Sequence, residues 1–401
     1  MRENTRFPVR IFIDPSGYRW RNHGDAMMLE VALARIRAFW PAAAVTVHNL
    51  EQEPLLALDP AVEPLDPSAA VAWRVASRMP FRRVAATAAL RIKRRDPKLL
   101  RTYLDAVRNA DLVFVSGAGR LNDAFARDAF TLLGTLELAP RSGAVTALMG
   151  QGLGPIRNRA LRRRTAAVLP RVDFLTLRER VAGPALLESL RMSPASVTVT
   201  GDDAITRAFH ARADRAGDAI GINVRVADYA GVDRRTTAIV AAAVRDAARR
   251  HRAPLVPIPI DLGDLSAIRT MLADSTLGEE VPNTDALLAL LPRCRVVVAG
   301  SYHAATLALS MGIPAVTIAA SDYYADKFRG LAGQFGPRCR VLFASDPAFA
   351  AQLTRAIDEA WASAEDDRAP LLEAAERQIA LGEAAYRRLY GIVEGRRRRA
   401  L

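Results

Sequence analysis

Short apolar runs alternate with longer segments rich in Ala, Leu and Arg along most of the chain. Short runs bounded by turn residues are typical of buried strands, whereas the longer amphipathic segments are typical of helices. In the first half we expect a long loop at 51–69 and helical stretches from there to Asn109. The other helices that we expect in this half lie at 25–40, 122–133 and 158–169. The strands lie at 9–14, 44–49, 111–117, 144–152, 174–179 and 197–202.

A polar segment at 211–218 interrupts this alternation and is interpreted as a linker. The second series of strands and helices predicts a second domain of similar size. We therefore expect an N-terminal domain at 1–212 and a C-terminal domain at 213–401, both Rossmann-like with mostly parallel sheets and facing a cleft. The strands expected in this half lie at 219–226, 254–260, 294–300, 315–320 and 339–344. The helices lie at 234–250, 264–273 and 346–395.

Composition narrows the class of protein without naming a function. The chain has 401 residues, of which half are hydrophobic and a quarter charged, so a fibrous or wholly disordered chain is excluded. Two cysteines cannot build a disulfide framework, and a reducing compartment fits best. The uncharged stretch 296–320 is long enough to span a bilayer, but glycines divide it into strand, helix and strand. The net charge of +13 favours anionic partners.

Two polar clusters follow predicted strands of the first domain, where open α/β sheets bind ligands. In the first cluster Gly24 permits a tight turn, and Asn22 or Asp25 either caps the next helix or faces a ligand. The second cluster, 116–123, has two glycines that let the backbone approach a ligand and ends at Asp123. A tight turn without any ligand explains this second cluster equally well.

Two further clusters end strands of the same domain. Gln151 stands among three glycines, which again indicates a close backbone approach. Asp202 and Asp203 are adjacent acids at a strand end, but the chain has no other metal-ligand spacing, and we expect no metal. Asp202 is a candidate acid, base or hinge residue, and the alternative is that it caps the following helix.

The sharpest candidates lie in the second domain. Arg225 ends a predicted central strand, and its guanidinium suits a phosphate or a carboxylate unless that strand end lies at the surface. Ser301 is a plausible helix cap that places His303 in the first helical turn. A helix N-terminus offers free N–H groups and a positive end, and an imidazole there can hold or protonate an anion. A capped helix with a buried, satisfied histidine is the alternative.

Taken together in chain order, these clusters resemble the polysaccharide pyruvyl transferase family. The resemblance covers about 9–340 and rests on the order and spacing of motifs that are individually weak. The motifs are Asn22-x-Gly24-Asp25, Ser116-Gly117-x-Gly119, Gly150-Gln151-Gly152-x-Gly154-Pro155, Arg178-Glu179, Thr200-Gly201-Asp202, Gly221-x-Asn223-x-Arg225, Ser301-Tyr302-His303-Ala304, Ala308-Leu309-x-x-Gly312-x-Pro314 and Lys327-Phe328-Arg329-Gly330.

The resemblance implies a glycosyltransferase-B-like fold and transfer of a pyruvyl group from phosphoenolpyruvate to two hydroxyls of a sugar, which makes a ketal. The acceptor would be a saccharide of a cell-envelope or exported polysaccharide, or its lipid-linked precursor. No metal or nucleotide cofactor is expected. The residues carried over are His303 as acid and Asp25 as base, with Arg225, Ser301, Tyr302, Lys327, Asn22, Asp123, Gln151 and Asp202 as substrate-binding residues.

One position departs from the family pattern, and two other functions compete with this one. Many members carry Arg two positions before the histidine, where this chain has Ser301, so one cation is missing from the expected set. The alternatives are a nucleotide-sugar-dependent glycosyltransferase of the same architecture and a non-catalytic relative. Nucleic-acid binding would rest on net charge alone and is not expected. We expect a cytoplasmic protein, with peripheral contact at the inner membrane face suggested by the basic surface.

Overall fold

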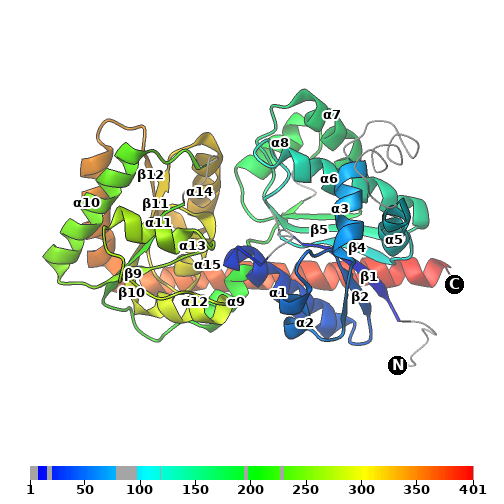
Figure 1. The fold of residues 1–401 in the computed structure, drawn as a ribbon, viewed down its shortest axis with the longest axis horizontal. Coiled ribbons are helices and arrows are strands. Elements are labelled where there is room, and N and C mark those ends of the chain that lie inside the picture. Colours follow the sequence, from blue (N-terminus) through cyan, green and yellow to red (C-terminus); the bar gives the residue numbers. More distant parts are fainter. Residues whose placement is uncertain are drawn as a thin grey trace.

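The computed structural model describes residues 8–15, 20–77, 97–117, 119–193, 197–225 and 230–400. The chain forms two α/β domains, each built around one parallel sheet with helices packed on its faces (Figure 1). This architecture confirms the fold class predicted from the alternation of apolar and polar segments. No helix in the described part of the chain is long and apolar enough to cross a membrane. Both cysteines are buried and free.

The first sheet has seven strands in the order β3-β2-β1-β4-β5-β6-β7, and every pair is parallel. The direction in which the strands are added reverses between β1 and β4, and such a switch point opens a crevice at the carboxyl ends of the strands. The strands are β1 (Arg10–Asp14), β2 (Ala44–Val47), β3 (Val62–Pro64), β4 (Leu112–Val115), β5 (Val145–Gln151), β6 (Phe174–Leu177) and β7 (Thr198–Val199).

The second sheet has five parallel strands in the order β12-β11-β10-β8-β9. Its switch point lies between β8 and β10, so Arg225 and Ser301, which follow these two strands, come to the same crevice. The strands are β8 (Ala219–Asn223), β9 (Leu255–Pro257), β10 (Cys294–Ala299), β11 (Ala315–Ala319) and β12 (Cys339–Phe343).

The helices cover both sheets. In the first domain and at its junction with the second they are α1 (His23–Phe39), α2 (Gln52–Leu58), α3 (Pro67–Ala76), α5 (Pro97–Arg108), α6 (Ala126–Leu138), α7 (Arg159–Val168), α8 (Ala182–Ser189) and α9 (Ala204–His210), with short 3₁₀ turns η1 (Ala139–Ser142) and η2 (Leu169–Arg171). The remaining ones are α10 (Arg234–His251), α11 (Asp264–Met271), α12 (Thr284–Leu290), α13 (Tyr302–Ser310), α14 (Asp322–Phe335) and α15 (Phe349–Ala400), with η5 (Leu291–Arg293) and η6 (Gly336–Arg338).

The expected loop at 51–69 is wrong, because this segment forms α2, the edge strand β3 and the start of α3. Pro54 and Pro67 lie in the first turns of the two helices, where proline is tolerated since the N–H it lacks would have no helical partner. The helix expected from residue 122 begins only at Ala126, because Asn122 instead accepts a hydrogen bond from the Phe125 N–H. Of the helical stretch expected up to Asn109, residues 78–96 lie outside the described part.

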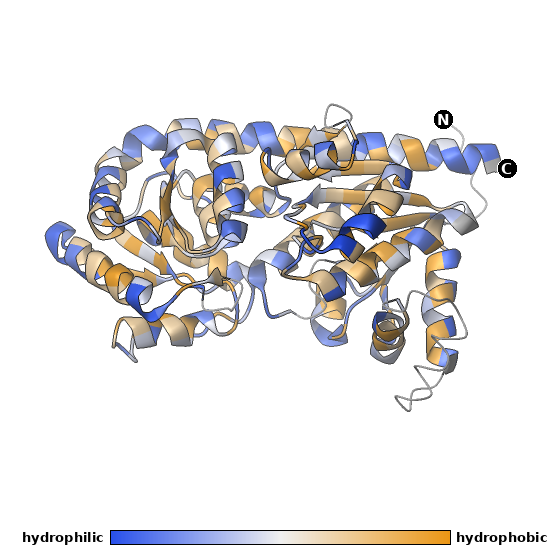
Figure 2. Cartoon of the chain, turned by 90° about the horizontal axis from the view of Figure 1, so that it is seen from above, coloured by the Kyte–Doolittle hydropathy of each residue, from blue (hydrophilic) through white to orange (hydrophobic). Residues whose placement is uncertain are grey.

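The last helix, α15, joins the two domains. It starts against the second sheet, where Leu353 and Ile357 are buried in the core, and it ends against the first sheet, where Tyr386 and Leu389 are buried. Figure 2 shows it running along one side of both domains, with apolar and polar residues alternating along its length. Burying each large apolar side chain is worth about 1.5–3 kcal/mol, so this helix stabilises both domains.

Candidate active site

A cleft of about 340 Å³ lies at the carboxyl ends of both sets of strands and is lined by residues of both domains. Its lining is rich in cations, because six Arg and Lys side chains face three carboxylates there. Such a surface favours an anionic ligand. The lining cations are Arg21, Arg74, Arg120, Arg178, Arg225 and Lys327, and the lining carboxylates are Asp25, Asp128 and Asp261.

The N-terminus of α13 opens into this cleft. Ser301 caps the helix, since its Oγ accepts a hydrogen bond of 3.3 Å from the Ala304 N–H, and both Ser301 and His303 line the cleft. The turn before the helix packs tightly on the segment that follows β8, because a Cβ added at Gly300 would lie 3.0 Å from the backbone nitrogen of Arg225. The positive end of the helix and its first-turn N–H groups are thereby directed at any anion in the cleft.

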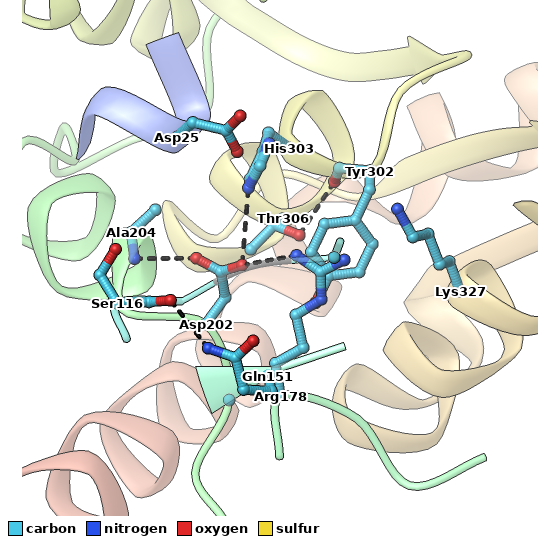
Figure 3. A network of polar contacts seen from close by, with 12 residues as sticks. Asp25, Ser116, Gln151, Arg178, Asp202, Ala204, Tyr302, His303, Thr306 and Lys327 are labelled. Carbon is cyan, nitrogen blue, oxygen red and sulfur yellow. Dashed lines mark hydrogen bonds and ion pairs between the residues drawn. The ribbon is translucent and has the colours of Figure 1, made fainter. Parts of the chain in front are cut away.

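His303 is held by a buried carboxylate. Its Nε2 lies 3.5 Å from the Asp202 Oδ2, and the Arg178 Nη1 lies 3.5 Å from the same oxygen (Figure 3). Burial by itself raises the pKa of Asp202, but the contacts with His303 and Arg178 outweigh burial, so the net shift of this pKa is downward. Asp202 therefore stays ionised, and its carboxylate beside Nε2 orients the imidazole.

The other side of the imidazole faces the first turn of α1. A Cβ added at Gly24 would lie 2.1 Å from the His303 Cγ and 2.2 Å from its Nδ1, so only glycine fits at this position. Asn22 caps α1, since its Oδ1 accepts from the Asp25 N–H at 3.1 Å. The capping alternative therefore holds for Asn22, although the residue also lines the cleft. Figure 3 shows the Asp25 carboxylate near His303, and no hydrogen bond or ion pair within the described residues occupies it.

Arg225 lies just after β8 and is fixed by two carboxylates. Its Nη1 lies 3.2 Å from the Asp264 Oδ1, and its Nη2 lies 3.2 Å from the Asp261 Oδ2. Burial raises the pKa of Asp264, and the charge of Arg225 opposes this rise. Asn223 steadies the same carboxylate by donating from its Nδ2 to the Asp264 Oδ2 at 3.1 Å. The guanidinium is thus presented at the carboxyl end of a central strand, as the sequence predicted.

Lys327 reaches the cleft from α14. Its ammonium donates to the Tyr323 hydroxyl and lies 3.8 Å from the centre of the Tyr323 ring. Burial and the neighbouring Arg178 hold the pKa of Lys327 well below its ordinary value. Tyr302, the first residue of α13, lies under the Arg178 guanidinium at 4.3 Å, and burial raises the pKa of its hydroxyl. Lys327 and Tyr302 therefore both belong to the cleft, as expected.

Three predicted residues do not line the cleft: Asp202, which lies beside the imidazole of His303, as well as Gln151 and Asp123. Gln151 is fully buried, and its Nε2 donates to the carbonyls of Ser116 at 2.7 Å and Met149 at 2.9 Å, which ties β4 to β5. Asp123 accepts from the Arg157 N–H at 2.5 Å and the Asn158 N–H at 3.1 Å, so both of its oxygens hold that turn. Gln151 and Asp123 shape the strand ends next to the cleft rather than form its surface.

The sequence reasoning missed the first-domain wall of the cleft. There Arg120 donates to the buried Asp14 at 2.9 Å, and Arg74 forms an ion pair with Asp128 at 2.6 Å. Burial lowers the pKa of His48, which lies beside Asp14, to about 4, although the charge of Asp14 opposes this shift. Asp14 ends β1 and His48 follows β2, so the rule that polar strand ends mark a site could have found them.

Metal ligation finds no support in the part of the chain that the structure describes. No cluster of three or more His, Cys, Asp or Glu side chains is close enough there to hold a metal ion. The polar groups of the cleft are instead arranged as guanidinium–carboxylate and imidazole–carboxylate pairs. Such an arrangement can bind an anion, deliver a proton to it and take a proton from a neutral partner.

Comparison with known proteins agrees with this geometry. The family model described as polysaccharide pyruvyl transferase matches residues 22–322. No curated protein sequence matches the chain.

Among solved structures, a glycosyltransferase from Rickettsia africae is 9% identical, with 96% of this chain and 98% of that chain covered and a TM-score of 0.56. A UDP-GlcNAc 2-epimerase from Neisseria meningitidis, bound to UDP-GlcNAc, is 13% identical, with 97% and 100% covered and a TM-score of 0.53. A UDP-GlcNAc 2-epimerase from Methanocaldococcus jannaschii is 12% identical, with 88% and 93% covered and a TM-score of 0.53. At these identities the likeness shows the two-domain, glycosyltransferase-B-like fold alone.

Proposed function

We propose that this chain, which belongs to the polysaccharide pyruvyl transferase family, transfers a pyruvyl group from phosphoenolpyruvate to two hydroxyls of a sugar. The sugar would be part of a cell-envelope or exported polysaccharide or of its lipid-linked precursor. One observation carries the proposal: a guanidinium, a helix N-terminus and a carboxylate-held imidazole converge in one cation-rich cleft between the domains.

The donor suits the second-domain wall of the cleft, which Arg225 and the N-terminus of α13 form. Phosphoenolpyruvate carries a phosphate and a carboxylate, and Arg225 with the N-terminus of α13 offers the charges and N–H groups that such anions prefer. The two carboxylates that fix Arg225 keep its guanidinium in place before the donor arrives. Preorganised donors of this kind stabilise charge without having to reorient during the reaction.

The reaction requires one acid, one base and two bond-forming steps at the same carbon. In the first step His303 protonates the methylene carbon of the donor, while one sugar hydroxyl forms a bond to C2 and gives up its proton to Asp25. In the second step the other hydroxyl forms a bond to C2 as the bond from C2 to the phosphate oxygen breaks, and the proton of this hydroxyl leaves with the phosphate. The products are the cyclic ketal and inorganic phosphate, and no oxidant, reductant or metal is required. Asp202 would keep the imidazole oriented.

The test is calorimetric titration of phosphoenolpyruvate into the wild type and into the variants Arg225→Ala and His303→Ala, with UDP-GlcNAc titrated in parallel. We expect the wild type to bind phosphoenolpyruvate, and both variants to bind it at least about 10-fold more weakly, because each loses a charge-assisted contact. Arg250→Ala is the matched control, since this exposed arginine pairs with Asp358 outside the cleft lining. A wild type that binds UDP-GlcNAc but not phosphoenolpyruvate would instead favour a nucleotide-sugar-dependent glycosyltransferase.

A further inference from the structure

Two carboxylates share the Arg225 guanidinium, but the protein holds them differently. Asp264 is 3% exposed, and its Oδ2 accepts hydrogen bonds from the Asn223 Nδ2 at 3.1 Å and from two backbone N–H groups at 3.0 Å. The Asp261 side chain is 28% exposed, and within the described residues its carboxylate has no hydrogen bond or ion pair other than the one of 3.2 Å to Arg225. Asp264 is therefore a fixed partner of the guanidinium, whereas Asp261 can leave it.

Asp261 also takes part in a backbone contact between the two domains. It lies opposite Asn22 in an isolated antiparallel bridge, and the residues on either side of this pair make the two backbone hydrogen bonds, of 2.8 Å and 3.2 Å. In such a non-hydrogen-bonded pair the side chains lie close, with Cβ atoms about 4.5–5.5 Å apart. Both side chains line the cleft. The carboxylate of Asp261 and the amide of Asn22 are therefore near neighbours on its surface.

Asn22 uses one end of its amide and leaves the other without a partner. Its Oδ1 caps α1 by accepting from the Asp25 N–H at 3.1 Å, whereas its Nδ2 donates to no residue that the structure describes. A carboxylate is the strongest acceptor that such an amide can meet. A bond from Nδ2 to Asp261 would fix the amide plane whose other end caps the helix, and it would polarise the capping bond. The first turn of α1, where Asp25 lies near His303 (Figure 3), would become more ordered as a result.

An anion at Arg225 shifts this balance. The donor's phosphate would compete with Asp261 for the guanidinium and would also repel its carboxylate, because like charges repel strongly at short range in a partly buried cleft. Asp264 cannot yield, since its second oxygen is held by three N–H donors. Asp261 can yield, and the unused amide group of Asn22 lies directly across the bridge from it.

We propose that Asp261 is a positioning residue that changes partner when the donor binds: it leaves Arg225 to the donor's phosphate and accepts a hydrogen bond from the Asn22 amide. The inference rests on the proposed function, because phosphoenolpyruvate is the anion that starts the exchange and Asp25 is the base that the exchange positions. No proton moves and no covalent bond changes in this step. Donor bound in the second domain thus orders the segment of the first domain that carries the base.

The first measurement is calorimetric titration of phosphoenolpyruvate. In Asp261→Ala we expect the affinity to rise about 5-fold, because the donor no longer has to displace and repel a carboxylate. A residue that only held Arg225 in place would lower the affinity instead. In Asn22→Gly, which keeps a residue tolerated at a helix N-cap but removes the amide, the affinity should fall about 3-fold. The double variant should bind as tightly as Asp261→Ala, since Asn22 then has no carboxylate to receive.

The second measurement is amide hydrogen exchange of residues 21–28, which include the Asp25 N–H. In the wild type, donor binding should slow exchange in this segment about 5-fold, because the cap of α1 becomes more ordered. In Asp261→Ala the donor should bind more tightly and yet leave the exchange rate unchanged. Asp261 as a merely structural residue would not separate the two readouts in this way.

Asp358→Ala is the matched control for removing a carboxylate that pairs with an arginine of the second domain. Asp358 is 37% exposed as a side chain and lies 2.9 Å from Arg250, outside the cleft lining. Both readouts should stay as in the wild type, and a thermal melt of each variant checks that it is folded. If Asp261→Ala does not fold, Asp261→Asn keeps the size of the side chain without its charge and should raise the affinity in the same direction.

Two results overturn the exchange: an unchanged or weaker affinity for phosphoenolpyruvate in Asp261→Ala, or slowed amide exchange that persists in this variant. Failure of the proposed function looks different, because in that case the wild type itself does not bind phosphoenolpyruvate. Inorganic phosphate then serves as the probe, since the exchange requires only an anion at Arg225, and the same two readouts decide it. A wild type that binds neither anion would overturn both the exchange and the proposed function.

Discussion

On the first-domain wall of the cleft, Arg120 and Arg74 each form a short ion pair, at 2.9 Å to Asp14 and 2.6 Å to Asp128. The contacts are longer on the other wall, where Arg225 lies 3.2 Å from each of its two carboxylates. His303 also belongs to this second-domain wall, and it lies 3.5 Å from Asp202.

The difference between the walls separates two kinds of binding surface. In the short pairs the opposite charges offset each other, so they present a surface with little net charge, which suits a neutral sugar hydroxyl. Longer pairs hold the cation in position through weaker hydrogen bonds, and an incoming anion can compete with them for its N–H groups. Phe125 adds an apolar face to the first-domain wall, whereas the second has the positive end of α13. We therefore propose that the acceptor binds at the first wall and the donor at the second.

The largest effect should come from His303, since this proposal makes it the acid that protonates the donor carbon. His303→Ala should lower the rate of pyruvyl transfer by about 10²–10⁴-fold, the usual contribution of a positioned acid. Gly24→Ala keeps the imidazole of His303 but displaces its ring, because the added Cβ would lie 2.1 Å from the His303 Cγ. We expect a smaller loss there, and the rate of ketal formation measures both variants. An unchanged transfer rate in His303→Ala would mean that His303 is not the acid.

A second effect, on stability, tests whether the first wall is held by buried pairs. The pKa of His48 is lowered to about 4 in the folded protein, against about 6.5 in the unfolded chain. Between these values the unfolded state binds more protons, so the free energy of unfolding should fall by up to about 3 kcal/mol as the pH drops from 7 to 4. Urea titrations at several pH values measure this, and His48→Asn should flatten that part of the profile. An unchanged slope in the variant would place the titrating group elsewhere.

The sequence predicted the second wall better than the first, for a physical reason. Arg225, Ser301 and His303 each lie within a few residues of a predicted strand, so the local pattern of strand, turn and helix already locates them. The pairs of the first wall join segments that are far apart in the chain, since Arg120 reaches Asp14 and Arg74 reaches Asp128. No local pattern reports that these residues pair, although Asp14 and Arg120 themselves stand at or just after predicted strands.

The errors in the fold have a similarly local cause. Pro54 and Pro67 fall in the loop expected at 51–69, although each lies in the first turn of a helix, where proline does not interrupt hydrogen bonding. The role of Arg178 depends on three segments meeting, which bring Asp202, Tyr302 and Gly119 around one guanidinium. The sequence shows the motif around Arg178 but not the space that Gly119 leaves for it.

The third effect separates the two walls directly by steady-state kinetics. Arg225→Met should raise the KM for phosphoenolpyruvate about 30-fold and leave the KM for the acceptor nearly unchanged, because a charge-assisted contact is worth about 2 kcal/mol. Arg120→Met should do the reverse, raising the KM for the acceptor. A double variant that shows both increases together, each unchanged from its single variant, would establish two independent walls. The opposite pattern, with Arg120 acting on the donor, would exchange the two assignments.

A fourth and smaller effect concerns protons taken up with the donor. Burial and Arg178 lower the pKa of Lys327, and an anion beside it should raise this pKa again. Binding of phosphoenolpyruvate should therefore take up as much as about one proton, and its affinity should fall as the pH rises through the lowered pKa of Lys327. Titration in two buffers of different ionisation enthalpy measures this uptake, and Lys327→Met should abolish it. The same uptake in that variant would assign the proton to another group.

The smallest effect concerns binding to a membrane surface outside both walls. It tests how the acceptor reaches the first wall. Arg159, Arg162, Arg163 and Arg191 line a surface depression of about 350 Å³ next to α7, without a carboxylate among its lining residues. If a lipid carries the saccharide, this face of the first domain should bind vesicles that contain anionic lipid, each arginine adding about 1 kcal/mol at low salt.

Charge alone would also draw so basic a protein to such vesicles, so the comparison must hold net charge constant. Replacing Arg159, Arg163 and Arg191 by Gln should weaken sedimentation with anionic vesicles more than replacing Arg234, Arg235 and Arg249, which are exposed on α10 of the second domain. Equal weakening would mean that the whole surface, not the first domain, meets the membrane. Sedimentation with anionic vesicles no greater than with neutral ones would leave the acceptor to reach the first wall from solution.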